Sequence, residues 1–117
     1  MQTKGIVPED FMARYTNYLV TVLPTTSLQR SLATVLETCG LNLIYEAPDY
    51  LVAKEKPGNV SFSKLATVEV LINPSSTAPT ASTVNLVVKN EELPLQTNNH
   101  CQQVFEQVNE AIMVVSN

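Results

Sequence analysis

The sequence is poor in charge. Only 15% of its 117 residues are Asp, Glu, Lys or Arg, whereas about 25% is typical of a soluble domain. Thr, Ser, Asn and Gln fill most of the polar positions instead, and these uncharged groups cost less to remove from water than ions do. Such a surface also repels other molecules only weakly, which favours association with other proteins.

Several residue types that carry chemistry are scarce as well. The chain has no Trp, one His, two Cys and three Gly, and 6% of its residues are aromatic. The glycines do not form a phosphate-binding loop, and the aromatic residues offer little surface for stacking on bases. The lone His and two Cys form no close cluster of metal ligands. We therefore expect no cofactor and no metal site.

The distribution of charge argues against a nucleic-acid partner. The net charge is −4, and the lysines and arginines form no run, whereas non-specific binding depends on neutralising phosphates. No apolar stretch approaches the roughly 20 residues that a membrane-spanning helix needs, and the first residues lack the apolar core of a secretory signal. We expect a cytoplasmic protein without a membrane span, whose partner is another protein or a second copy of itself.

The length fits a single domain. Residues 1–13 show no period and predict an N-terminal arm, whereas residues 14–117 predict one α+β domain. Within that domain, residues 73–82 contain two prolines among small polar residues, which predicts a mobile loop. The fold must therefore be built from the segments on either side of this loop.

Hydrophobic periodicity predicts two helices and five strands. Residues 15–23 have the β-branched and aromatic composition of a strand. Residues 26–39 predict a helix, with a capping box at Thr26 and Gln29 and a left-handed cap at Gly40. Four more strands are expected at 41–46, 50–55, 65–72 and 83–89. A second helix begins near residues 97–99, with an apolar stripe from Cys101 to Val115.

This order, β-α-β-β-β-β-α, predicts a two-layer sandwich with both helices on one face of the sheet. A strand–helix–strand connection is usually a right-handed crossover between parallel strands. We therefore expect the first two strands to be parallel and the sheet to be mixed, although mostly antiparallel.

His100 and Cys101 are the only neighbours that suggest a reaction. A thiol near a helix N-terminus can be acidified, and an adjacent imidazole can act as its base. Consecutive helical side chains point about 100° apart, however, so these two do not face each other. Cys101 also lies in phase with the apolar stripe, and Cys39 completes the stripe of the first helix. We predict that Cys39 and Cys101 pack as apolar side chains and form no disulfide. We also predict that the chain has no catalytic residue.

Two pairs of carboxylates are candidates for acid–base chemistry. Glu91 and Glu92 fall on a connecting loop, and Glu106 and Glu110 fall on a solvated helix face. Catalytic carboxylates need burial or a charged partner to shift their pKa. Both pairs are therefore interpreted as surface groups.

Strand alternation leaves one face of the sheet for a partner. In the two clearest strands, Val and Ile side chains alternate toward the helices, which leaves Leu71 and Val87 on the opposite face. Weaker phasing adds Leu19 and Ile44 to that face. Apolar side chains on an uncovered sheet face are typical of a protein-docking surface.

The sequence thus favours a non-enzymatic protein-interaction module, such as a small adaptor, assembly factor or accessory subunit. One alternative is a protein that binds a small hydrophobic ligand or lipid in a cavity between helices and sheet. A second alternative is a thiol-dependent enzyme that uses Cys101.

Overall fold

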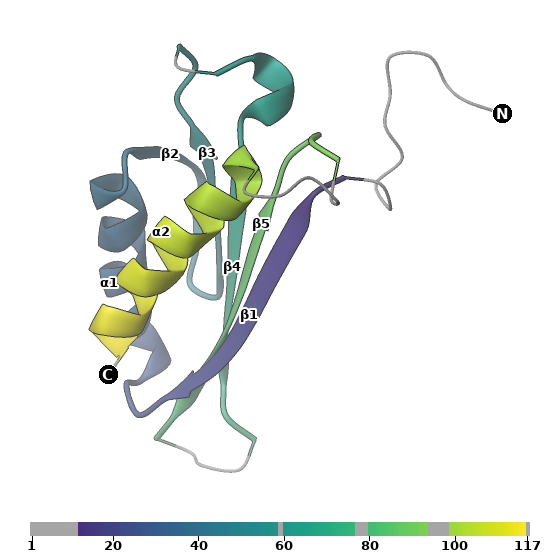
Figure 1. Cartoon of the computed structure of the whole chain (residues 1–117). Helices are drawn as coiled ribbons and strands as arrows, with labels where there is room; N and C mark the ends of the chain where they lie inside the picture. Colours follow the sequence, from purple (N-terminus) through teal and green to yellow (C-terminus); the bar gives the residue numbers. More distant parts are fainter. Residues whose placement is uncertain (1–11, 59, 77–79, 94–98, 117) are drawn as a thin grey trace, which may run out of the picture.

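The computed structural model describes residues 12–58, 60–76, 80–93 and 99–116. Its elements follow the order that the sequence predicts, and two helices cover one face of a five-stranded sheet (Figure 1). In chain order they are β1 (Arg14–Thr21), α1 (Thr25–Thr38), β2 (Leu41–Ala47), β3 (Tyr50–Glu55), the short 3₁₀ helix η2 (Phe62–Lys64), β4 (Thr67–Pro74), β5 (Ser82–Lys89) and α2 (His100–Ser116). The two-layer α+β sandwich is therefore confirmed.

The strands are ordered β1-β5-β4-β3-β2, and every neighbouring pair is antiparallel. The first two strands do run parallel to each other, as expected, but they are not neighbours, and the expected mixed sheet is wrong. α1 does return the chain so that β2 runs in the same direction as β1, but it carries the chain across the full width of the sheet. The two strands consequently lie at opposite edges, and the sheet is antiparallel rather than mixed.

The core lies between the helices and the inward side of the sheet. Cross-strand pairs such as Val68 with Val88 and Val70 with Leu86 place aliphatic side chains side by side on this face. α1 contributes the buried residues Leu28, Leu32 and Leu36, and α2 contributes Val104, Val108 and Ile112. The largest of these side chains are fully shielded from water, so this face of the sheet forms the core of the domain.

The two ends of α1 differ from each other in how well the sequence predicts them. Gly40 has a φ of +86°, and its N–H donates to the carbonyl oxygen of Glu37, as a left-handed C-terminal cap requires. At the other end the capping box is wrong. The helix begins one residue earlier, at Thr25, with Pro24 as the N-cap and no side-chain cap.

The described parts of the arm and the loop adjoin the sheet. Ala13 is fully buried and exchanges backbone hydrogen bonds with Glu92 and Asn90, so the last residue of the expected arm belongs to the domain. Strands β4 and β5 also include residues 73, 74 and 82 of the expected loop. Residues 1–11 of the expected arm and 77–79 of the expected loop lie outside the described residues.

Candidate functional site

Among the described residues, no helix packs on one face of the sheet, and we call this face the open face. Cross-strand pairing defines its members, because directly paired residues share a face. One row across the sheet joins Tyr18, Asn85, Leu71 and Tyr50, and the row beside it joins Thr16, Val87, Glu69 and Val52. The remaining members are Arg14, Val20, Thr83, Lys89, Thr67, Asn73, Lys54, Asn42, Tyr45 and Ala47.

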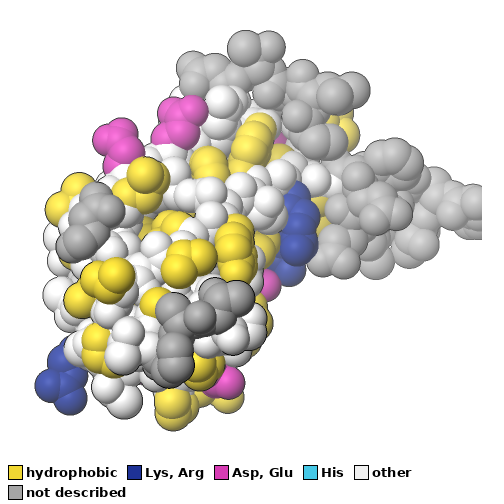
Figure 2. All heavy atoms as spheres, turned by 90° about the horizontal axis from the view of Figure 1, so that it is seen from below, with side chains coloured by type: hydrophobic (Ala, Val, Ile, Leu, Met, Phe, Trp, Pro, Cys, Tyr) yellow, Lys and Arg dark blue, Asp and Glu magenta, His cyan; other side chains and the backbone are white. Residues whose placement is uncertain are grey.

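Large apolar side chains on this face are in contact with water. Tyr18 is 58% exposed, Val20 60%, Tyr45 54% and Leu71 39%. The exposed apolar surface continues beyond Val20 to Val22, which is 78% exposed. Figure 2 views the end of the molecule where α1 begins, and there hydrophobic side chains lie among uncharged ones with few charges between them. Several large apolar side chains exposed on one face mark a contact site more often than single apolar residues scattered over a surface do.

Charge is confined to one part of the open face. Arg14, Lys89 and Lys54 lie in the row closest to η2, and the carboxylate of Glu69 forms a 3.0 Å ion pair with Lys89. The rows farther from η2 are uncharged apart from Glu69. Removing that part of the face from water would therefore desolvate few ions.

Two of the four residues expected to bind a partner are exposed. Leu71 lies near the middle of the open face and is 39% exposed. Ile44 is 58% exposed and lies at the register shift between Leu43 and Tyr45, where β2 carries a β-bulge. A bulge re-aims side chains at a sheet edge. Whether a partner contacts either residue stays a prediction.

The other two residues, Leu19 and Val87, are not exposed for contact with a partner as the sequence predicts. Leu19 pairs with Val84 and packs against the core, so its expected outward orientation is wrong. The reason lies in the polar residues of β1, since Asn17 also points inward and donates to Asn109 of α2. Val87 does lie on the open face by its pairing, but it is only 9% exposed, and the Lys89–Glu69 ion pair joins two of its immediate neighbours.

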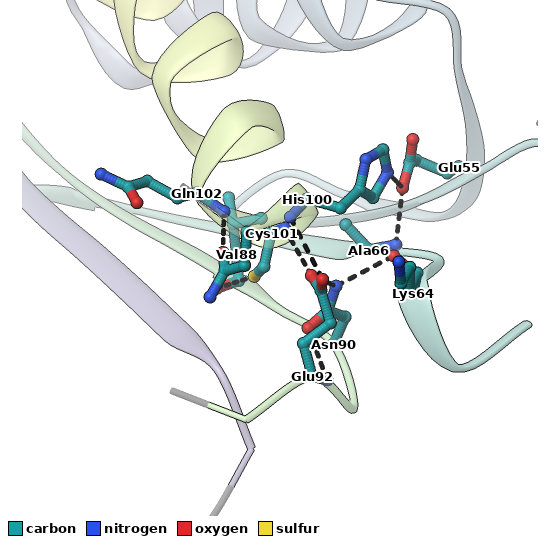
Figure 3. A network of polar contacts seen from close by, with 10 residues as sticks. Glu55, Lys64, Ala66, Val88, Asn90, Glu92, His100, Cys101 and Gln102 are labelled. Atoms are coloured by element: carbon teal, nitrogen blue, oxygen red, sulfur yellow. Dashed lines mark hydrogen bonds and ion pairs between the residues drawn. The ribbon is translucent and has the colours of Figure 1, made fainter. Parts of the chain in front are cut away.

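A buried carboxylate that the sequence analysis placed on a surface loop organises the start of α2 (Figure 3). Glu92 is 9% exposed, and its two carboxylate oxygens accept hydrogen bonds from the backbone N–H groups of Cys101 at 2.8 Å and His100 at 3.2 Å. Asn99 accepts from the N–H of Gln102 at 2.7 Å. These amides are among those that a helix leaves without an internal partner, so Glu92 completes the cap.

The environment of Glu92 favours its charged form. Burial alone would raise the pKa of this carboxyl, but hydrogen bonds from the Asn90 side chain and from the amides of Cys101 and His100, together with the nearby His100 ring, hold the pKa below its usual value. Asn90 also donates to the carbonyl oxygen of Lys64 at 2.9 Å. Glu92 and Asn90 together therefore link the end of β5, the η2 turn and the start of α2.

A second polar contact joins α2 to β3. Nε2 of His100 lies 2.7 Å from Oε1 of Glu55, and the same oxygen accepts a 2.8 Å hydrogen bond from the backbone N–H of Ala66. Both side chains are about one-fifth exposed. No local sequence pattern links positions 55 and 100, so this pair was not predicted. Its geometry is that of a structural contact that holds the imidazole against the strand end.

The two thiols are free, and burial favours their neutral form. Burial raises the pKa of Cys101 to about 12, and the carboxylates of Glu92 and Glu55 act in the same direction. Its sulfur lies 3.5 Å from the carbonyl oxygen of Val88. Burial also raises the pKa of Cys39, which is only partly buried. Thiolate is the nucleophilic form, and both pKa shifts disfavour it at neutral pH.

Two small clefts lie beside α1. The larger, of about 310 Å³, is lined by residues at the start of α1 and at the β2–β3 turn, among them Gln29 and Pro48. The second, of about 250 Å³, lies where the end of α1, the β2–β3 pair and α2 meet. Its lining combines apolar and polar groups: Cys39, Gly40, Leu41, Glu55, Lys56, Val104, Gln107 and Val108.

Within the described ranges, no three His, Cys, Asp or Glu side chains gather in a way that could hold a metal ion. Among the same residues, no helix has the length and apolar character needed to cross a bilayer.

Comparison with known proteins identifies a fold and no family. No protein-family model matches the chain, and neither does any curated protein sequence. Among solved structures, the protein DR_A0006 from Deinococcus radiodurans superimposes with a TM-score of 0.54 at 14% identity, covering 89% of this chain and 95% of that one. Ara h 8.0201 superimposes with a TM-score of 0.50 at 10% identity, covering 91% and 99%. The likeness is to the Bet v 1-like fold.

Proposed function

We propose that the protein is a non-enzymatic interaction module that binds another protein, or a second copy of itself, through the open face. The observation that carries this proposal is the exposure of Tyr18, Val20, Tyr45 and Leu71 on a sheet face that no described helix covers. Aromatic side chains are enriched where proteins contact each other. They supply a large contact area at little cost in side-chain entropy.

Because the open face carries few charges, we expect the surface of the partner that contacts it to be apolar and uncharged. Glu69 and Lys89 already neutralise each other, and the rows farther from η2 hold Thr and Asn between the apolar side chains. Neutral polar groups lose less on desolvation than ions do. We therefore expect affinity to come mainly from apolar burial and to depend weakly on salt.

The test uses a photoreactive amino acid at position 18 on the open face and, as a control, at position 113 on α2. Tyr18 is 58% exposed and Met113 is 47% exposed, so both positions tolerate the label. In native lysate we expect adducts from position 18 only. Unlabelled wild-type protein should compete for them, and Leu71→Asp should compete at least about tenfold less well, as loss of a central apolar contact would cause.

Met113→Asp is the matched competitor, because it places the same charge on a similarly exposed residue outside the open face. It should compete like the wild type. Equal adducts from positions 18 and 113, or no adducts together with a strictly monomeric protein in light scattering, would reject the open face as a docking surface.

A second candidate function is the binding of a small amphipathic molecule. It is favoured by the 250 Å³ cleft between α1, α2 and the β2–β3 pair, where apolar side chains meet Glu55 and Lys56. Proteins with the Bet v 1-like fold often bind hydrophobic ligands. The cleft is slightly smaller than the roughly 300 Å³ at which typical ligand sites begin, so only a small molecule would fit.

Native mass spectrometry of the protein purified from its source separates the two candidates. A retained small molecule that disappears in Val104→Phe, which narrows the cleft, would support ligand binding. Val114→Phe is the control, because Val114 lies on α2 but outside the cleft lining. A protein that carries no molecule in either form would count against the cleft.

A further inference from the structure

Phe62 is the most exposed large apolar side chain among the described residues, at 80%. It opens η2, which stands at the end of the molecule opposite the one seen in Figure 2 (Figure 1). An exposed phenylalanine does not contribute the free energy that its side chain would contribute if it were buried. The position is therefore a candidate contact point.

The turn that carries Phe62 is held in place by the domain. Backbone hydrogen bonds join Lys64 to Ser61 at 2.9 Å and Leu65 to Phe62 at 3.2 Å. The N–H of Glu91 donates to the carbonyl oxygen of Ser63 at 2.9 Å, and the Asn90 side chain donates to that of Lys64 (Figure 3). Phe62 thus extends from an anchored turn.

The same end of the molecule presents positive charge. Arg14, Lys54, Lys56 and Lys64 are all exposed, and they lie at the start of β1, at and just beyond the end of β3, and on η2. Lys89 lies beside them on β5, paired with Glu69. Among the described lysines and arginines, only Arg30 of α1 lies elsewhere.

Two nearby acidic groups are turned inward. Glu55 accepts a hydrogen bond from the N–H of Ala66 and lies against His100, and Glu92 caps α2. Among the described residues, Glu91 and, near the end of α1, Glu37 are exposed carboxylates at this end. A chain with a net charge of −4 therefore presents, around Phe62, more exposed cations than exposed anions.

We propose that this end, formed by Phe62 with Arg14, Lys54, Lys56 and Lys64, binds the surface of an anionic membrane. The phenyl ring enters the headgroup region, and the lysine ammonium groups contact lipid phosphates and carboxylates. A single ring on a protruding turn suits a fluid surface that deforms around it. A protein partner would instead need a pocket for the ring and roughly 800 Å² of complementary surface.

The absence of Trp from the chain allows a direct test. Phe62→Trp introduces a sole fluorophore at the turn, and Val114→Trp does so at a similarly exposed site, 74% exposed, at the other end of the molecule. With vesicles of phosphatidylcholine and phosphatidylserine at low salt, we expect the emission of Phe62→Trp to shift to the blue and that of Val114→Trp to stay unchanged. Vesicles of phosphatidylcholine alone should shift neither.

Co-sedimentation with the same vesicles measures the charge contribution. Lys56→Glu/Lys64→Glu should weaken binding at least about 25-fold, because each lysine near an anionic surface contributes a factor of about five. Phe62→Ser should weaken it about tenfold or more. Arg30→Glu is the matched control and should bind within about twofold of the wild type, because it reverses a charge outside this end.

Three outcomes overturn the proposal: no binding of the wild-type protein to anionic vesicles at low salt, an equal blue shift in both Trp variants, or an equal loss in Arg30→Glu. Binding of polyglutamate that requires Phe62, without binding of vesicles, would also overturn it and assign this end to an acidic protein. Because the open-face cross-linking relies on other residues, either proposal can fail alone.

Discussion

The two faces of the sheet use the same strands for different purposes. On the covered face Val70, Leu86 and Val88 are fully buried beneath the helices. On the open face the next residue along β4, Leu71, is 39% exposed. One face therefore stabilises the domain through close packing, whereas the other contributes less to stability and leaves apolar surface available for contact.

The largest expected difference between the faces comes from placing a carboxylate on each of two adjacent residues. Val70→Asp buries an unpaired charge in the core, and we expect it to lower the free energy of unfolding by more than about 4 kcal/mol or to abolish folding. Leu71→Asp should lower it by less than about 1 kcal/mol. Denaturant titration followed by circular dichroism measures both, and similar losses would contradict the face assignment.

A smaller effect is expected at the cap that holds α2 over the covered face. Glu92→Gln replaces one acceptor oxygen by an NH₂ group that faces backbone N–H groups. We expect the free energy of unfolding at neutral pH to fall by about 1–3 kcal/mol. Glu91→Gln, one residue away and exposed, is the matched control and should change little.

The same cap has a predictable pH dependence. The pKa of Glu92 is lower in the folded protein than in the unfolded chain, so its contribution to stability is complete above the unfolded pKa. That contribution is lost as the pH falls through the folded pKa. The difference between wild type and Glu92→Gln, measured by urea titration, should therefore shrink in acid. A difference that stays constant down to about pH 2 would contradict the role of the charged form.

The smallest expected effect is a difference in the rate of alkylation between Cys39, at the end of α1, and Cys101, at the start of α2. With iodoacetamide at neutral pH, the partly exposed Cys39 should react before Cys101, whose pKa is raised to about 12. Mass spectrometry of the peptides gives the two rates. The rate at which Cys101 is modified then reports how often α2 separates from the sheet. Rapid modification of Cys101 would show that the helices open away from the covered face more often than the packing indicates.

The element order and the covered face could be predicted because their signals are local. In β4 and β5 the residues from Val68 to Ile72 and from Val84 to Val88 alternate clearly, and the buried side follows directly. The first strand lacks this signal, because aromatic, β-branched and polar residues occur on both of its sides. Polar Asn17 is tolerated inward since α2 supplies Asn109 as its partner, and the prediction for Leu19 failed for that reason.

The candidate sites depended more on contacts that a sequence does not display. The cap by Glu92 and the contact between Glu55 and His100 join residues from different elements, so neither has a spacing to recognise. The bulge at Ile44 depends on the pairing of β2 with β3. Phe62 lies in a short turn that has no hydrophobic periodicity. An aromatic residue between serines and close to lysines could nevertheless have indicated an exposed side chain.

The position of β1 at the sheet edge also governs when the domain can be completed. Its described pairing is with β5 alone, from Arg14 with Lys89 to Thr21 with Ser82. As the chain leaves the ribosome, β2, β3 and β4 can form hairpins with their immediate successors, whereas the earliest strand must wait for almost the last. Such distant pairing carries a large loop-closure cost, so we expect chains truncated before residue 82 to leave the β1 segment unpaired.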